Sequence, residues 1–211
     1  MNSDISEPAY SPAAMRILTT ATRLFMQRGY SAVSVNDIVQ AADVTKPTLY
    51  YHFSDKEELF VVVSIHMLAE MHAVMRQAVA GQRDTRQRLV ALAHVLLQAP
   101  NGDTRMMRHQ AREHLSPERQ QRLAAAFGRY MVTPLREVMQ QGLDSGELAG
   151  HSADELAFLF LGLMEGFQRQ TVPDREPDIA AAEPSFSTDR FSAETVVDLF
   201  LHGTAARNRA S

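Results

Sequence analysis

Apolar residues recur at steps of three and four along most of the chain, and no run alternates between apolar and polar residues as a half-buried β-strand does. This spacing predicts an all-α fold with about nine helices in total. The first predicted helix begins at Ser11 and Pro12, a good N-cap followed by a residue that needs no helical partner for its nitrogen. It ends at Gly29.

Two short helices are predicted next. Ser34 begins the first of them as the N-cap of a Ser-x-x-Asp box that Asp37 completes. Thr45 caps the second, which ends near Tyr51, and residues 41–44 join the two. Two short helices joined in this way have the spacing of a helix-turn-helix.

The rest of the chain continues in helices. Pro134 is expected to kink the seventh, and Gly142 and Gly146 break its pattern. Residues 172–190, rich in Pro, Ala and Asp, are predicted to form a loop. The expected helices cover residues 55–80, 84–98, 103–115, a segment that starts at 116, 152–170 and 192–206.

Charge gives no general reason to expect nucleic-acid binding. The formal net charge is −4, and residues 1–60 contain five Lys or Arg against seven Asp or Glu. Any DNA affinity must therefore come from local geometry rather than from a broad basic surface. The chain has two lysines, Lys46 and Lys56, and both fall in or just after the second short helix.

Other classes of protein are disfavoured. The chain has no cysteine, so it has no disulfide or thiol nucleophile. Residues 1–10 lack the features of a secretory signal, and the longest nearly apolar run, Leu156 to Met164, is too short to span a bilayer. We therefore expect a cytoplasmic protein with no membrane partner.

The first turn of the second short helix carries the expected chemistry. A helix N-terminus presents free N–H groups and partial positive charge, both suited to phosphates or base edges. Hydroxyl, ammonium, phenol and imidazole groups gather there and just beyond it, on Thr45, Lys46, Thr48, Tyr50, Tyr51, His52 and Lys56.

The segment 29–60, which contains VSVNDIVQAADVTKPTLYYHFSDKEELF, closely resembles the DNA-binding domain of the TetR repressor family. The resemblance implies that Ser34 and Lys56 contact phosphates and that Thr45, Lys46, Pro47 and Thr48 approach the major groove. It also implies that Tyr50, Tyr51 and His52 contact backbone or bases. The family often has glycine where this chain has Pro47, so its sequence preference does not carry over.

Less specific interpretations exist for some of these residues. Leu49 and Phe53 are expected in the core, and Tyr51 lies two positions from each of them. In the alternative interpretation, one of Tyr50 and Tyr51 is partly packed against the protein and does not contact DNA. His52 alternatively serves only as a cap of its helix.

We predict a disordered tail over 1–11, and the resemblance implies a helix-turn-helix domain over 12–58 and an effector-binding and dimerisation domain over 59–211. Residues 152–170 are apolar nearly all round, which predicts burial against a second copy of the chain. A homodimer with twofold symmetry would match a palindromic double-stranded DNA operator. The expected dimer interface consists of Phe158, Phe160, Leu161, Met164, Val197, Phe200 and Leu201.

The middle helices are expected to enclose a cavity for a small effector, walled by adaptable methionine and aromatic side chains. Tyr130 is its best polar anchor, although a stripe of this kind is more often ordinary core. The candidate residues are Met67, Met71, Met106, Met107, His109, Phe127, Tyr130 and Met131.

A cationic stripe in residues 103–115 bears on the effector's charge. Arg105, Arg108, His109 and Arg112 share one side of this predicted helix. They form a solvated face, pair with acids of the long helix, or hold an anionic head group at the cavity mouth. The last alternative predicts apolar or amphiphilic effectors that are neutral or acidic.

Catalytic and metal chemistry is not expected. No convergent set of nucleophile, acid and base is visible, and the histidines at 66, 72, 109 and 114 lack the spacing of a zinc pair. We predict a ligand-responsive repressor with no cofactor, no metal and no catalytic residues. The alternative is a ligand-independent DNA-binding regulator that acts through protein partners.

Overall fold

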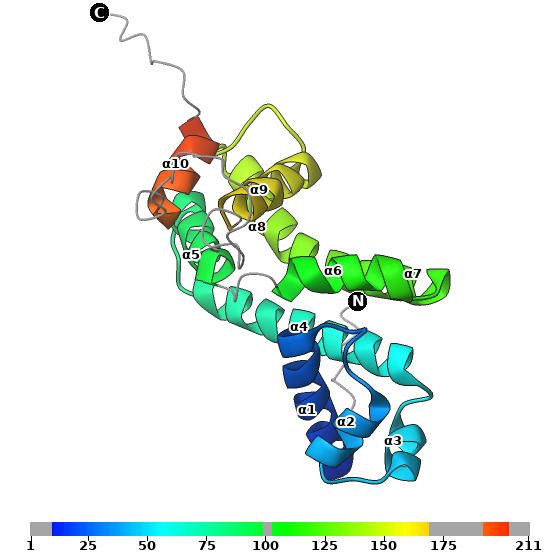
Figure 1. The fold of residues 1–211 in the computed structure, drawn as a ribbon. Helices are drawn as coiled ribbons and strands as arrows, with labels where there is room; N and C mark the ends of the chain where they lie inside the picture. Colours follow the sequence, from blue (N-terminus) through cyan, green and yellow to red (C-terminus); the bar gives the residue numbers. More distant parts are fainter. Residues whose placement is uncertain (1–9, 99–102, 169–191, 203–211) are drawn as a thin grey trace, which may run out of the picture. The chain divides into compact units, whose positions relative to one another are not determined.

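The computed structural model describes residues 10–98, 103–168 and 192–202, and every regular element among them is a helix (Figure 1). The prediction of an all-α fold is confirmed. The elements are α1 (Pro12–Arg28), α2 (Val35–Ala41), α3 (Lys46–His52), α4 (Lys56–Val79), α5 (Thr85–Gln98), α6 (Asp103–His114), α7 (Pro117–Phe127), the π-helix η1 (Gly128–Val132), α8 (Thr133–Asp144), α9 (Ala153–Gln168) and α10 (Ala193–His202).

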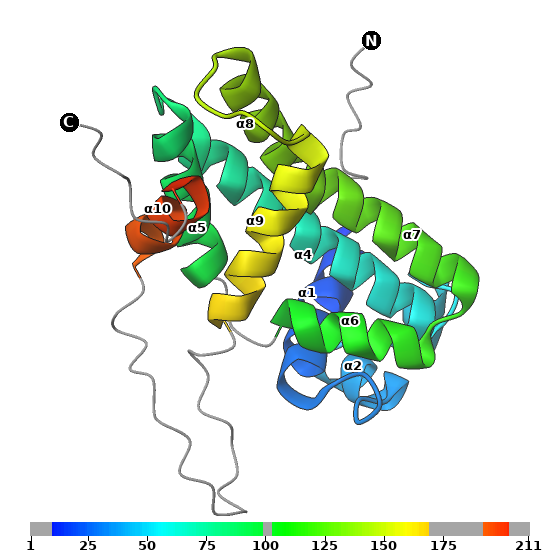
Figure 2. The same cartoon turned by 90° about the horizontal axis from the view of Figure 1, so that it is seen from above.

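The chain divides into two compact units, and the division falls inside α4 after Leu68. The first unit contains α1–α3, the start of α4 and residues 103–126. The second contains the rest of α4, α5 and the helices from η1 onward, where α10 packs beside α5 (Figure 2). The division into compact units does not coincide with residue 59, where the effector-binding domain is expected to begin. That functional boundary stays a prediction. The expected tail and the loop at 172–190 lie almost wholly outside the described residues.

An aromatic cluster forms the centre of the first unit. Phe25 of α1 and Phe60 of α4 are both 1% exposed, and their ring centroids lie 5.3 Å apart in an edge-to-face arrangement. Tyr30, in the loop after α1, adds its ring at 5.0 Å from Phe60 and 5.9 Å from Phe25. This cluster ties the start of α4 to the helices before it.

The predicted helix starts are present. Ser11 caps α1 by accepting from the Ala14 N–H. Ser34 and Asp37 form the reciprocal capping box at α2, since each side chain accepts from the other residue's backbone N–H. The hydrogen bonds from Ser34 hold the pKa of Asp37 below its ordinary value.

The predicted helix with a kink at Pro134 is wrong in detail. Two α-helices, α7 and α8, are joined there by the π-helix η1, and Pro134 lies in the first turn of α8. Proline has no N–H to donate to the carbonyl four residues earlier, which belongs to Tyr130. His72 Nδ1 lies 3.2 Å from that carbonyl oxygen and donates to it, which replaces the missing bond.

Gly142 does not break the helix, contrary to expectation. It is buried within α8, where a Cβ would lie 2.8 Å from Leu148 Cδ1 and 2.9 Å from Thr85 Cγ2. Glycine is required there because α8 passes so close to these side chains. The turn follows at Gly146, whose φ of +76° favours glycine.

Among the described residues, α4 alone is long and apolar enough to cross a membrane by length and composition. Of its most apolar stretch, 39% is buried inside the protein. Five consecutive residues from Leu59 to Val63 are at most 9% exposed. Packing within the first unit therefore accounts for much of its apolar character.

Candidate nucleic-acid interface

The helix-turn-helix is formed by α2, α3 and the turn between them. Leu49 on the inner side of α3 is fully buried, and Phe53, just after it, is 3% exposed, so both are core residues as expected. Asp43 adopts a φ of +52° in the turn, a left-handed conformation that Asp tolerates better than most residues. This turn sets the direction of α3 relative to α2.

The opposite side of α3 is exposed. Lys46 and Pro47 lie at its start and are exposed, while Tyr51 is 85% exposed and Tyr50 48% exposed. Tyr50 is thus the more covered of the two tyrosines, but neither belongs to the core. An exposed helix start with two accessible phenols can meet a nucleic-acid groove without rearrangement.

The hydroxyl groups at the start of α3 are already paired with each other. Thr45 Oγ1 accepts from the Thr48 backbone N–H at 3.3 Å and lies 2.9 Å from Thr48 Oγ1. Capping fixes the orientation of both side chains, and in either direction of the hydroxyl pair the Thr48 oxygen keeps at least one lone pair for a donor. His52 ends the helix, and its Nε2 lies 3.3 Å from Ser11 Oγ at the start of α1.

Lys56, expected to contact a phosphate, is held in place by an aromatic ring. Its Nζ lies 4.0 Å from the centroid of the Tyr30 ring. Burial lowers the pKa of Lys56, and the nearby Asp37 carboxylate opposes that shift. Ser34, the other expected phosphate contact, is exposed and belongs to the same capping box as Asp37.

The sequence did not reveal that α6 and α7 contact these loops. Gln110 Oε1 accepts from the Tyr30 N–H at 2.9 Å, and the His114 imidazole stacks on the Tyr30 ring at 5.1 Å. Arg119 of α7 donates to Asp55 at 2.6 Å and to Glu57 at 2.9 Å. No local pattern relates residues more than sixty positions apart, although three acids at the start of α4 indicate that cations are nearby.

The residues expected to bind an effector divide between the two units. Met107 and Met131 are buried at 6% and 5% exposure, Met67 packs against the core of the first unit, and Tyr130 contacts the His72 ring. The first unit contains Met67, Met106, Met107 and His109, and the second contains Met71, Phe127, Tyr130 and Met131. The side chain of Met106 lies outside the described residues. These eight remain a predicted site.

The cationic stripe of α6 is largely a solvated face where it is described. His109 is 75% exposed and pairs with Glu113 of its own helix at 3.5 Å, and Arg112 is exposed. Glu57 and Glu58, at the start of α4, pair with Arg119 and Arg122 of α7. The side chain of Arg105 lies outside the described residues. In the described part of the chain, no three His, Asp or Glu side chains form a group that could hold a metal ion.

The expected dimer interface needs correction. Phe160 and Val197 are fully buried and Met164 is 2% exposed, because the inner side of α9 and α10 packs within the protomer. Leu161, Phe200 and Leu201 are partly buried. Phe158 is 60% exposed, and so is the neighbouring Leu159 at 59%. These two residues lie on an open, largely apolar groove of about 1050 Å³, which is also lined by Leu156, Gly162, Leu163, Leu199 and Phe200 and, on its polar side, by His151, Asp154 and Glu155.

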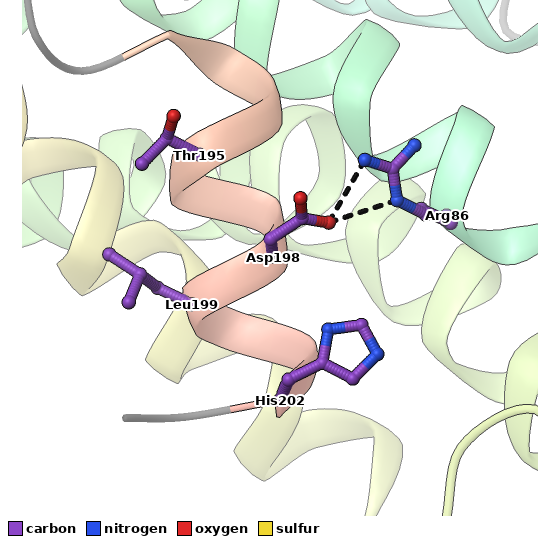
Figure 3. Close-up of a pocket in the computed structure, with 5 residues that line it drawn as sticks. All are labelled: Arg86, Thr195, Asp198, Leu199 and His202. Atoms are coloured by element: carbon purple, nitrogen blue, oxygen red, sulfur yellow. Dashed lines mark hydrogen bonds and ion pairs between the residues drawn. The ribbon is translucent and has the colours of Figure 1, made fainter. Parts of the chain in front are cut away.

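A second pocket, of about 470 Å³, lies between α5 and α10 (Figure 3). Arg86 reaches the same carboxylate oxygen of Asp198 with two nitrogens, each at 2.9 Å, while Thr195, Leu199 and His202 line the remainder. His94 pairs the same two helices by lying 3.1 Å from Glu194. Since Asp198 neutralises Arg86, this pocket fastens α10 to α5 and has little to offer an acidic ligand.

The helix-turn-helix region matches a family model. Residues 17–63 match the model described as "Bacterial regulatory proteins, tetR family". This part of the chain is a DNA-binding domain of the TetR family of transcription regulators. Members of this family are regulators and not enzymes.

Individual TetR-family relatives agree with this assignment. The chain is 40% identical to the transcriptional activator FasR of Mycolicibacterium smegmatis over 76 residues, which cover 36% of this chain and 35% of FasR. It is 28% identical to the repressor KstR2 of Rhodococcus jostii over 152 residues, or 69% of this chain and 72% of KstR2. The FasR match thus spans about a third of that regulator.

Solved structures share the fold. FadR from Bacillus subtilis in complex with stearoyl-CoA has a TM-score of 0.71 at 16% identity, covering 90% of this chain and 99% of FadR. A regulator from Saccharomonospora viridis in complex with choline has a TM-score of 0.69 at 24% identity, covering 89% and 95%. AibR in complex with isovaleryl coenzyme A and operator DNA has a TM-score of 0.62 at 23% identity, again covering 89% and 95%.

Proposed function

We propose that the chain is a homodimeric repressor that binds a palindromic DNA operator and is released from it by a small effector. The observation that carries the DNA-binding part is the outer side of α3, where Lys46, Pro47 and Tyr51 are exposed around a capped helix start. A helix with a buried inner side and a polar, exposed start is the arrangement that reads a major groove.

The contacts on DNA follow from this arrangement. We propose that Pro47 and Thr48 approach base edges, while Tyr50, Tyr51 and His52 reach the backbone or the bases at the end of α3. Lys56 and Ser34 would contact phosphates, Lys56 from a position fixed by Tyr30. Phosphate contacts position the protein on the duplex and base contacts give it specificity.

Dimerisation supplies the second reading helix. We propose that the apolar groove around Phe158 and Leu159 packs against its symmetry mate, with Leu161, Phe200 and Leu201 at its border. A twofold interface uses the same surface on both subunits, so two α3 helices would face two half-sites related by the same axis.

The effector is proposed to be a neutral or acidic amphiphile. Acyl thioesters of coenzyme A, seen with FadR and AibR, have an apolar acyl chain and an anionic phosphate-bearing part. The complex of a structural relative with choline is the counterexample, because choline is a cation. Adaptable methionine side chains among the predicted contacts suit an apolar chain of varying length.

A panel of ligands tests the proposal. Fatty acids, acyl-coenzyme A thioesters, flavonoids and quaternary ammonium dyes are each added to the protein bound to a fluorescent duplex selected from random sequence. We expect release by at least one acidic or neutral amphiphile, with the affinity for DNA reduced about 5- to 150-fold as in typical allosteric coupling. Release by the cationic dyes alone would refute the effector class, and release by no member of the panel would favour a regulator that does not respond to these ligands.

A further inference from the structure

We propose that Arg119 sets the affinity for DNA by masking the carboxylates of Asp55 and Glu57 beside Lys56. When α7 moves away from α4, these carboxylates would face the DNA phosphates without a counter-charge. The inference rests on the proposed function in one respect, since it requires that the surface around α3 and Lys56 binds DNA.

The contacts of Arg119 are specific to the start of α4. Its Nη2 donates to Asp55 at 2.6 Å and its Nη1 to Glu57 at 2.9 Å, while its Nε lies 3.7 Å from Glu58. The Arg119 side chain is 23% exposed, while those of Asp55 and Glu57 are 47% and 33% exposed, so these are surface ion pairs formed by a partly covered arginine. Arg122, one turn further along α7, donates to Glu58 at 2.6 Å. Two arginines of one helix thus neutralise most of the charge of three acids.

These acids lie next to the residues expected to contact phosphate. Asp55 and Glu57 flank Lys56 in the chain, and both carboxylates, after burial itself, help to raise the pKa of Tyr30, whose ring holds the Lys56 ammonium. Burial alone would raise the pKa of Asp55. The Glu58 N–H and the Arg119 guanidinium outweigh burial, so the pKa of Asp55 is lowered and the group is firmly ionised. The Asp55 carboxylate therefore faces the surface as a charged group, and the contact with Arg119 determines how much of that charge DNA encounters.

Arg119 belongs to the hairpin formed by α6 and α7, which also contacts the loop that contains Tyr30. Gln110 and His114 of α6 both contact Tyr30, and His114 Nε2 lies 2.7 Å from Ser31 Oγ. The Ser116 N–H, just before α7, donates to Glu57 at 3.3 Å. Helices α6 and α7 are therefore part of the unit that contains the helix-turn-helix. A displacement of this hairpin would move Arg119 and Arg122 away from the acids together. The surface that faces DNA would then become more negative.

Charge-specific variants separate masking from packing. Arg119→Gln removes the counter-charge and keeps a polar side chain. Asp55→Asn with Glu57→Gln removes the charges that Arg119 masks. Each replacement keeps one amide oxygen that can accept from the same backbone N–H, that of Glu58 for residue 55 and that of Ser116 for residue 57. Arg136→Gln is the matched control, because Arg136 is a half-exposed arginine of α8 with a weak pair to Asp154 at 3.9 Å.

The measurement is fluorescence anisotropy with a random-sequence 30-bp duplex and with a duplex selected by the wild-type protein, at several salt concentrations. Arg119→Gln is expected to weaken binding to both duplexes about five- to tenfold at low salt, and less as salt screens the carboxylates. Adding Asp55→Asn and Glu57→Gln to Arg119→Gln should restore the wild-type affinity or exceed it. Arg136→Gln should change it by less than about twofold, and thermal melting checks that each variant is folded.

Other outcomes would overturn the inference. If Arg119 acts only by packing, Asp55→Asn with Glu57→Gln raises the affinity by the same factor in the Arg119→Gln chain as in the otherwise wild-type chain, whereas masking requires a larger gain where Arg119 is absent. An unchanged affinity for DNA in a folded Arg119→Gln variant would also overturn the inference. If no palindromic duplex can be selected while loss and rescue still occur on random DNA, the operator proposal fails and the masking role stands.

Discussion

Replacing Phe158 and Leu159 together by lysine should convert the dimer into monomers and weaken operator binding by roughly 100-fold or more. These side chains are 60% and 59% exposed on the apolar groove of α9 and α10. A twofold interface would bring four added ammonium groups into an apolar contact, where burying unpaired charge is strongly unfavourable. A monomer engages one half-site and loses the gain of about 10²- to 10⁴-fold that two linked reading heads provide.

Sedimentation at several protein concentrations measures the first effect and DNA anisotropy the second. Val74→Lys is the control, because Val74 of α4 is 50% exposed and lies outside the groove. It should leave the dimer and the DNA affinity unchanged. A double variant that still sediments as the wild-type dimer would place the interface elsewhere.

Phe60→Ala should lower the free energy of unfolding by about 3–5 kcal/mol. Phe60 is 1% exposed and packs edge-on against Phe25 and Tyr30, so its removal leaves a cavity in the aromatic cluster of the first unit. Since Tyr30 also positions Lys56, DNA binding should fall together with stability.

Urea unfolding followed by circular dichroism measures this loss. Met15→Ala on the outer side of α1, where Met15 is 40% exposed, should change the free energy of unfolding by no more than about 0.5 kcal/mol. A loss below about 1 kcal/mol in Phe60→Ala would mean that the cluster does not hold the first unit together.

The parts of the fold that the sequence predicts well depend on near neighbours. Ser11, Ser34 and Thr45 cap the helices they were expected to cap, because a cap is decided within three residues. Leu49 is core for a similarly local reason, since the period of the helix assigns it to the inner side.

The remaining features depend on contacts between distant segments. Arg119 meets Asp55 and Glu57 only because α7 packs on the start of α4. Periodicity identifies apolar residues on α9 but not which of them α5, α8 and α10 bury, so it predicts Phe160 at the dimer interface although the structure buries it within the protomer. The π-helix η1 also depends on a distant segment, because His72 of α4 contacts the Tyr130 carbonyl that Pro134 leaves without a backbone donor.

The central claim is that two copies of this chain read two related half-sites through α3. Selection of duplexes from a random pool by the purified wild-type protein, followed by sequencing, tests it most directly. We predict an inverted repeat whose half-site centres are one helical turn, about 10–10.5 bp, or a multiple of it apart. Recovery of a single unrepeated site, or of no enriched sequence at all, would contradict the claim.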